Sequence, residues 1–331
     1  MEFARPILVT GCPRSGTTWV GSTLAASSEV FYIYEPFNRD AAHHLKLAER
    51  YVYLVPGDGE RYAGVVASLA KLGSLRHRVL LGARGALRGP GIRQDLPAVL
   101  ALRELIRFPG RFLRATRICL KDPLAFFAAE WLAATFDMQV IVLLRHPAGV
   151  ISSHLKLGWS HELGSMLRQA ALRRRFAGDL SDEIARFERT PEDELGSLIL
   201  QWKLFAHAAL QLREAHPDWL FVTHESLCER PLDQFEAIYQ HVGLRWTRRV
   251  AETIERDTAP GNPIDPAEHR QHMLRRESRS IVDTWRQRLD SASLQRIERE
   301  AGPVWRQLST IVHQHQPWRV PSGLTRPAFE T

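Results

Sequence analysis

The stretch PILVTGCPRSGTTW, residues 6–19, decides the fold. It begins with the short apolar, β-branched run Pro6–Thr10, which is typical of a buried strand. A turn framed by Gly11 and Gly16 follows, and from Thr17 the apolar side chains recur on one helical face. This succession of strand, G-x-x-x-x-G turn and helix has the frame of a phosphate-binding P-loop.

The turn is chemically suited to hold an anion. Its two glycines relieve steric limits, the backbone N–H groups of residues 15–18 are expected to point inward, and a helix N-terminus favours negative charge. The hydroxyls of Thr17 and Thr18 add donors, and Arg14 adds a permanent positive charge. Nucleotide triphosphatases carry a lysine at the position of Thr17, where it serves the β- and γ-phosphates. Its absence favours a donor without a γ-phosphate and without a metal.

The remainder of the chain alternates between strand and helix patterns. Further strands are expected at Val30–Tyr34, Arg117–Lys121, Gln139–Leu144 and Trp219–Thr223, and helices over about 124–136, from Pro147, over about 193–215, over 232–242 and around 294–305. This alternation predicts an α/β fold: a P-loop-like, mainly parallel sheet with helices on both faces. In such sheets ligands bind beyond the carboxyl ends of the strands, so the strand-to-helix turns are where a site is expected.

Composition limits the classes of partner. The 331 residues carry 44 Lys+Arg against 37 Asp+Glu, a net charge of +7, which suits a phosphorylated cofactor, an acidic glycan, nucleic acid or a membrane surface. Arginine dominates the basic residues, and its forked guanidinium suits phosphate or sulfate. Three cysteines without a CxxC pair argue against a zinc site or a disulfide framework. Neither a secretory signal nor a run of about 18 apolar residues is visible, which favours a cytoplasmic protein without a membrane span.

The phosphate loop also resembles a known motif. Cys12-Pro13-Arg14-Ser15-Gly16-Thr17-Thr18-Trp19 is similar to the 5′-phosphosulfate loop of sulfotransferases, P-[KR]-[ST]-G-T-T-W. Those enzymes take a sulfonate from 3′-phosphoadenosine 5′-phosphosulfate (PAPS) and release the bisphosphate PAP, with no metal required. The resemblance implies that this cofactor is bound by Pro13, Arg14, Ser15, Gly16, Thr17, Thr18 and Trp19.

Two later segments resemble the same family. Its second motif is an Arg and, eight positions on, a Ser that hold the 3′-phosphate, and here Arg145 follows the strand QVIVLL with Ser153 eight residues later. The late segment RRESRSIVDTWRQR resembles the basic loop that returns to the cofactor, and makes Arg276, Arg279 and Ser280 further candidates. The resemblance implies one sulfotransferase domain over 1–331, in which 40–115 and 160–192 are helical or loop insertions on the acceptor side.

The resemblance also implies catalytic groups. Arg14 takes the position of the family's catalytic basic residue, and Glu35 ends a segment similar to the YEP of carbohydrate sulfotransferases, in which the glutamate is the expected base. Lys121-Asp122-Pro123 resembles the Lys-Ser-Pro of heparan-type enzymes, so Lys121 is a candidate contact to the sulfonate and Asp122 an alternative base. His43 and His44 lie just past the YEP segment and fit surface histidines better than a base.

The function expected from these residues is sulfonate transfer to an acceptor hydroxyl, on a carbohydrate in the leading interpretation. A small phenolic or lipid-linked alcohol is the alternative acceptor. A P-loop nucleotide kinase is the next alternative, which the missing lysine opposes. A basic module that binds nucleic acid or an acidic glycan is the third; the arginine-rich segment 71–117 would support it, although no nucleic-acid motif stands out. The sequence leaves the acceptor, the oligomeric state and the role of that segment open.

Overall fold

The computed structural model describes residues 4–38, 45, 47–58, 60–72, 117–191, 193–265 and 274–314. His43, His44 and nearly all of the arginine-rich segment lie outside the described residues, as does most of the expected insertion at 40–115.

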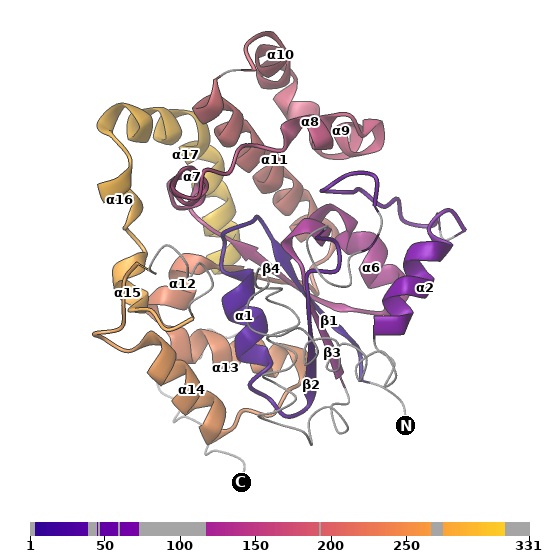
Figure 1. Ribbon diagram of the computed structural model, residues 1–331, viewed down its shortest axis with the longest axis vertical. Helices are drawn as coiled ribbons and strands as arrows, with labels where there is room; N and C mark the ends of the chain where they lie inside the picture. Colours follow the sequence, from indigo (N-terminus) through magenta and orange to yellow (C-terminus); the bar gives the residue numbers. More distant parts are fainter. Residues whose placement is uncertain are drawn as a thin grey trace, which may run out of the picture.

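A five-stranded, fully parallel sheet forms the centre of the described structure (Figure 1). Its strands are β1 (Ile7–Gly11), β2 (Val30–Tyr34), β3 (Arg117–Lys121), β4 (Gln139–Leu144) and β5 (Leu220–Thr223), in the spatial order β2-β3-β1-β4-β5. Every residue of β1 is buried, as expected for a strand covered on both faces. The predicted α/β class, with a P-loop-like, mainly parallel sheet, is confirmed.

Alternate residues of β1 belong to two separate cores, one on each face of the sheet. Ile7 and Val9 pack in a cluster with Val20 of α1 (Thr17–Leu24) and Phe235 of α13 (Pro231–Val242). Leu8 instead belongs to the larger cluster on the opposite face, which includes side chains of α11 (Glu194–Ala215) and α17 (Ser291–Gln314). This two-residue alternation gives the sheet a core with helices on each face. Because β1 is the third of the five strands, the turn after it lies at the middle of the sheet edge.

The remaining helices complete these layers. They are α2 (Ala63–Leu72), α6 (Ala129–Phe136), α7 (Pro147–Lys156), α8 (Leu163–Leu167), α9 (Ala170–Phe176), α10 (Ser181–Arg189), α12 (His224–Glu229), α14 (Arg248–Thr258), α15 (Ser278–Ile281) and α16 (Trp285–Arg288), with short 3₁₀ helices at Pro123–Ala128 and Gly178–Leu180. Gly243 ends α13 with a φ of 68°, the left-handed cap predicted from the sequence. In the described part of the chain, no helix combines the length and the apolar character that crossing a bilayer requires.

One expectation about helices needs correction. The apolar stretch 124–136 is not one α-helix, because it begins as the 3₁₀ helix Pro123–Ala128 and becomes α-helical only in α6. The side chain of Asp122 caps this 3₁₀ helix by accepting the N–H of Leu124 at 2.9 Å. Of the two forms expected for the stretch 160–192, helical or loop, the structure shows mainly helix, since α8, α9 and α10 occupy most of it.

Candidate functional site

A cavity of about 540 Å³ opens at the carboxyl edge of the sheet. Each of the five strands contributes a lining residue at its carboxyl end or in the turn that follows: Arg14, Glu35, Pro123, Arg145 and His224. This is the place where parallel α/β sheets bind their ligands. The phosphate loop, the Arg145 segment and the candidate base therefore face one space.

The phosphate loop has the backbone conformation that its glycines permit. Gly16 has a φ of 98°, and Arg14 takes the left-handed conformation with a φ of 68°, which is uncommon for a residue other than glycine. A Cβ on Gly11 would lie 2.1 Å from the carbonyl oxygen of Leu143, so no side chain fits there. The expectation that the N–H of Ser15 points inward is wrong. This N–H donates to the carbonyl of Cys12 at 3.2 Å and closes the turn instead.

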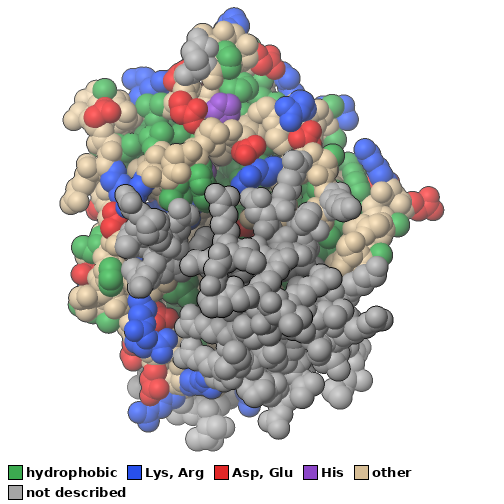
Figure 2. Space-filling model, viewed as in Figure 1, with side chains coloured by type: hydrophobic (Ala, Val, Ile, Leu, Met, Phe, Trp, Pro, Cys, Tyr) green, Lys and Arg blue, Asp and Glu red, His purple; other side chains and the backbone are tan. Residues whose placement is uncertain are grey.

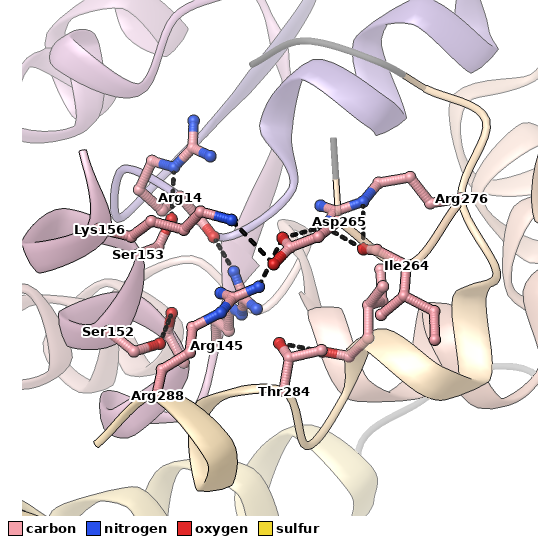
Figure 3. A network of polar contacts seen from close by, with 12 residues as sticks. Arg14, Arg145, Ser152, Ser153, Lys156, Ile264, Asp265, Arg276, Thr284 and Arg288 are labelled. Carbon is pink, nitrogen blue, oxygen red and sulfur yellow. Dashed lines mark hydrogen bonds and ion pairs between the residues drawn. The ribbon is translucent and has the colours of Figure 1, made fainter. Parts of the chain in front are cut away.

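Hydrogen bonds join the two predicted anchors. Nη1 of Arg145 donates to the carbonyl oxygen of Arg14 at 2.8 Å, and Nε of Arg14 donates to Oγ of Ser153 at 2.9 Å (Figure 3). The loop after β1 and the segment after β4 are therefore locked to each other, across 131 residues of sequence. The structure thus brings together the residues that the sequence singled out for the two phosphates.

Three neighbours position Arg145. Its carbonyl accepts the indole N–H of Trp202 at 3.1 Å, and a Cβ on Gly149 would lie 2.8 Å from its Nε, so that glycine makes room for the guanidinium. Glu225 accepts the N–H of His146 at 3.0 Å, which places a carboxylate beside this segment. The Nε of Arg145 is buried and has no hydrogen-bond partner among the described residues. A buried guanidinium nitrogen without a partner fits an external acceptor such as a phosphate oxygen.

Four arginines line the cavity, Arg14, Arg50, Arg145 and Arg276, against the three carboxylates of Glu35, Glu162 and Asp257. Burial and the neighbouring charges of Arg145 and Arg276 lower the pKa of Arg14 to about 10. The guanidinium still carries its proton at neutral pH, and the mutual repulsion of these side chains would be relieved by an anion between them. His224 in the same cavity is neutral at this pH, because burial and then Arg145 hold its pKa well below the usual range.

Glu35 and Lys121 form a buried ion pair at the ends of neighbouring strands. Oε1 of Glu35 accepts from Nζ of Lys121, and Oε2 accepts from the amide of Asn38 at 2.7 Å. The ammonium group also lies 4.0 Å from the ring centroid of Tyr34. Glu35 lines the cavity with a φ of 41°, a left-handed conformation that a surrounding structure must hold in place. Lys121 is fully buried and reaches the site through Glu35.

Asp122 is engaged in the local backbone. Its Oδ1 accepts the N–H of Leu124 at 2.9 Å and its Oδ2 accepts the N–H of Phe37 at 2.6 Å. Burial and the adjacent charge of Glu35 raise its pKa to about 8. Asp122 is fully buried and does not line the cavity, whereas Glu35 does, so the geometry favours Glu35 over Asp122 as the group that meets an acceptor.

The late basic segment contributes one of its three predicted residues to the cavity. Arg276 lines it, whereas Arg279 is exposed and Ser280 donates to Glu277 at 2.8 Å, and neither of these lines the cavity. Sequence reasoning missed His224 and Trp159, which also line it. His224 could have been found as the first residue after the last strand, the position that Glu35 and Arg145 take after β2 and β4.

Among the described residues no group of three or more His, Cys, Asp or Glu side chains could hold a metal ion. Sequence comparison finds neither a matching protein-family model nor a curated relative. Two solved structures are similar in their chain path. One is the sulfotransferase domain of the olefin synthase from Synechococcus PCC 7002, with 15% identity, a TM-score of 0.46 and coverage of 94% of this chain and 96% of that one. The other is the sulfotransferase STF9 from Mycobacterium avium, with 16% identity, a TM-score of 0.41 and coverage of 91% and 76%. A function for this chain therefore rests on the side chains of its cavity.

Proposed function

We propose that this protein transfers a sulfonate group from PAPS to an acceptor hydroxyl. The observation that carries the proposal is the direct hydrogen bonding between the two anchors, Arg14 with Ser153 and Arg145 with the Arg14 carbonyl, at the edge of one cavity. A ligand with anionic groups at two ends of a nucleoside suits a loop and a guanidinium that face the same space.

Different residues of the chain would bind the two ends of the nucleotide. The helix N-terminus at Thr17, with Arg14, would hold the 5′-phosphosulfate, and Arg145 with its unpartnered Nε would hold the 3′-phosphate. Arg276 adds a third cation to the same cavity. The threonine at position 17, where nucleotide triphosphatases carry a lysine, suits a donor without a γ-phosphate.

The bound donor would supply an activated sulfonate, whose S–O bond to the phosphate breaks as the acceptor oxygen bonds to sulfur. Glu35 would accept the proton of the acceptor hydroxyl, since its carboxylate lies in the cavity at the carboxyl end of β2. Lys121 positions that carboxylate. Arg14 and the loop would stabilise the negative charge that develops on the leaving phosphate.

A carbohydrate is the acceptor that we propose. Besides the loop and the anchors, the cavity is lined by hydrogen-bonding side chains and two aromatic rings: Asn38, Arg50, Tyr51, Trp159, Glu162 and Gln201. Planar polar groups and an aromatic face are a combination that can recognise a ring carrying several hydroxyls. On the face seen in Figure 2, basic and acidic side chains of the described residues are intermingled, which offers no support there for a basic nucleic-acid-binding module.

The test measures sulfonate transfer from labelled PAPS to a panel of glycans, phenols and lipid-linked alcohols, with and without Mg²⁺. We expect metal-independent transfer to a glycan; transfer only to a phenol or an alcohol would keep the reaction and reject the carbohydrate. Glu35→Gln should abolish most turnover while PAP binding survives. Glu183→Gln is the matched control, because Glu183 also pairs with a lysine, Lys203, but lines a different pocket. Wild-type turnover in Glu35→Gln would move the base elsewhere.

A second variant tests the cofactor. Arg145→Ala should weaken PAPS much more than adenosine 5′-phosphosulfate, which lacks the 3′-phosphate. Equal weakening of both ligands would reject the 3′-phosphate role of Arg145.

A further inference from the structure

Four basic side chains from separate segments gather beside the linked anchors. They are Arg145 after β4, Lys156 at the end of α7, Arg276 before α15 and Arg288 at the end of α16 (Figure 3). Burial and the neighbouring charges of Arg145 and Arg288 lower the pKa of Arg276. The cluster therefore holds like charges close enough to repel one another.

A single carboxylate, that of Asp265, bridges three of these cations. Its Oδ2 lies 2.8 Å from Nζ of Lys156, and its Oδ1 lies 2.7 Å from Nη2 of Arg288 and 3.7 Å from Nη2 of Arg276. Burial opposes the ionisation of Asp265, but the hydrogen bond from Lys156 and the charge of Arg288 outweigh it, so its pKa lies below the ordinary value. The ionised Asp265 is thus held by three basic side chains, those of Lys156, Arg276 and Arg288.

The carboxylate does not neutralise the cluster. Glu225 is the acid that acts on Arg145, and its Oε1 accepts the N–H of His146. Four cations thus face two carboxylates, and the Nε of Arg145 has no hydrogen-bond partner in the described structure. The excess of positive charge matches a phosphate monoester, which carries up to two negative charges and three acceptor oxygens.

The bridge is also exchangeable. The side chain of Asp265 is 47% exposed and that of Lys156 is 42% exposed. The Lys156 pair is therefore weak and screened by salt, whereas Arg276 and Arg288 are 26% and 21% exposed, so their pairs with Asp265 are screened less. A more highly charged anion can therefore replace the carboxylate without unpacking the core.

We propose that Lys156, Arg276 and Arg288 form, together with Arg145, the binding site of the nucleotide's 3′-phosphate. Asp265 is an internal anion that occupies this site until the phosphate displaces it. The inference rests on the proposed function, because PAP is the ligand it concerns. It adds to the cofactor contacts Lys156 and Arg288, which do not line the cavity themselves but are joined to its lining residue Arg276 through Asp265. It also makes Asp265 a competitor that lowers affinity for the 3′-phosphate. Return of Asp265 to the cations would assist release of the product PAP.

The experiment compares the dissociation constants of PAP and adenosine 5′-monophosphate, which lacks the 3′-phosphate, by calorimetry. Removing the competitor with Asp265→Asn should tighten PAP by roughly threefold to tenfold, the range expected for the loss of two or three weak ion pairs. Adenosine 5′-monophosphate should bind this variant as it binds the wild type. Lys156→Gln should act in the opposite direction and weaken PAP alone.

The opposite signs separate competition from a purely structural role, in which both variants would weaken PAP. Asp283→Asn is the charge-matched control, because Asp283 is an exposed acid that pairs with Arg286 within the same segment; neither ligand should respond to it. Unchanged or weaker PAP binding in Asp265→Asn, or equal tightening of both ligands, would overturn the role of Asp265. A wild-type protein that does not prefer PAP over adenosine 5′-monophosphate would instead reject the proposed function itself.

Discussion

Replacing Lys121 by methionine removes the buried ammonium group and keeps most of the side chain's length. We expect this change to lower the free energy of unfolding by about 3–5 kcal/mol, because it leaves the carboxylate of Glu35 buried without its cation. The side chain of Lys121 is fully buried and that of Glu35 is only 11% exposed, so water can replace the lost partner only in part. A Coulomb energy of about 4 kcal/mol for a pair near a protein surface gives the same scale.

A double-mutant cycle measured by urea unfolding tests this magnitude. Glu35→Gln should also destabilise, whereas the double variant should lose about 2 kcal/mol less than the sum of the single changes, because no unpaired charge remains. Lys203→Met is the matched control, since Lys203 pairs with the more exposed Glu183, and we expect a loss of about 1 kcal/mol. If Lys121→Met were no more harmful than Lys203→Met, or if the two changes at the site were additive, the pair would not be desolvated and the reasoning would fail.

Three further changes probe the surroundings of the anchors. Gly149→Ala places a Cβ 2.8 Å from Nε of Arg145, so PAP affinity measured by calorimetry should fall by about tenfold, in line with ordinary overpacking energies; unchanged affinity would show that the guanidinium can shift freely. Trp202→Phe removes the hydrogen bond to the Arg145 carbonyl and should lower stability in urea by about 1 kcal/mol, and a neutral result would mean that this carbonyl finds another donor. His146 stacks on Trp285 and burial lowers its pKa to about 4, from 6.5. As the pH falls, the imidazole of His146 takes up a proton in the unfolded state before it does so in the folded state. The free energy of unfolding should therefore decline between pH 6.5 and 4, by up to about 3 kcal/mol, and His146→Gln should reduce this decline. An equal decline in both proteins would contradict the shifted pKa.

The parts of the fold that could be predicted are those in which local pattern and burial agree. The runs Ile7–Gly11 and Gln139–Leu144 are β-branched, lie between turn residues and become central strands of the sheet. The 3₁₀ turn at Pro123–Ala128 was missed because its apolar run has the same composition as the start of a buried helix. The 3₁₀ turn is set by Asp122, whose side chain caps it and also accepts the N–H of Phe37. Phe37 lies 85 positions away from Asp122 in the sequence.

The same limit applies to the site. Arg14, Arg145 and Ser153 were found because short motifs carry them, and the structure brings them into contact. Lys156 and Asp265 belong to no motif, since their pairing arises only when α7 lies beside the segment that follows α14. Residues that act through contacts between distant segments leave no local pattern in a single sequence.

The bond from Arg145 to the Arg14 carbonyl has a kinetic consequence. It is made between atoms of the protein, and it holds the loop after β1 in its left-handed conformation without help from a ligand. Little backbone entropy is then lost on association, so the encounter rate would be set by diffusion and long-range attraction to the guanidinium groups. Raising the ionic strength should therefore slow capture of the nucleotide more than it accelerates escape.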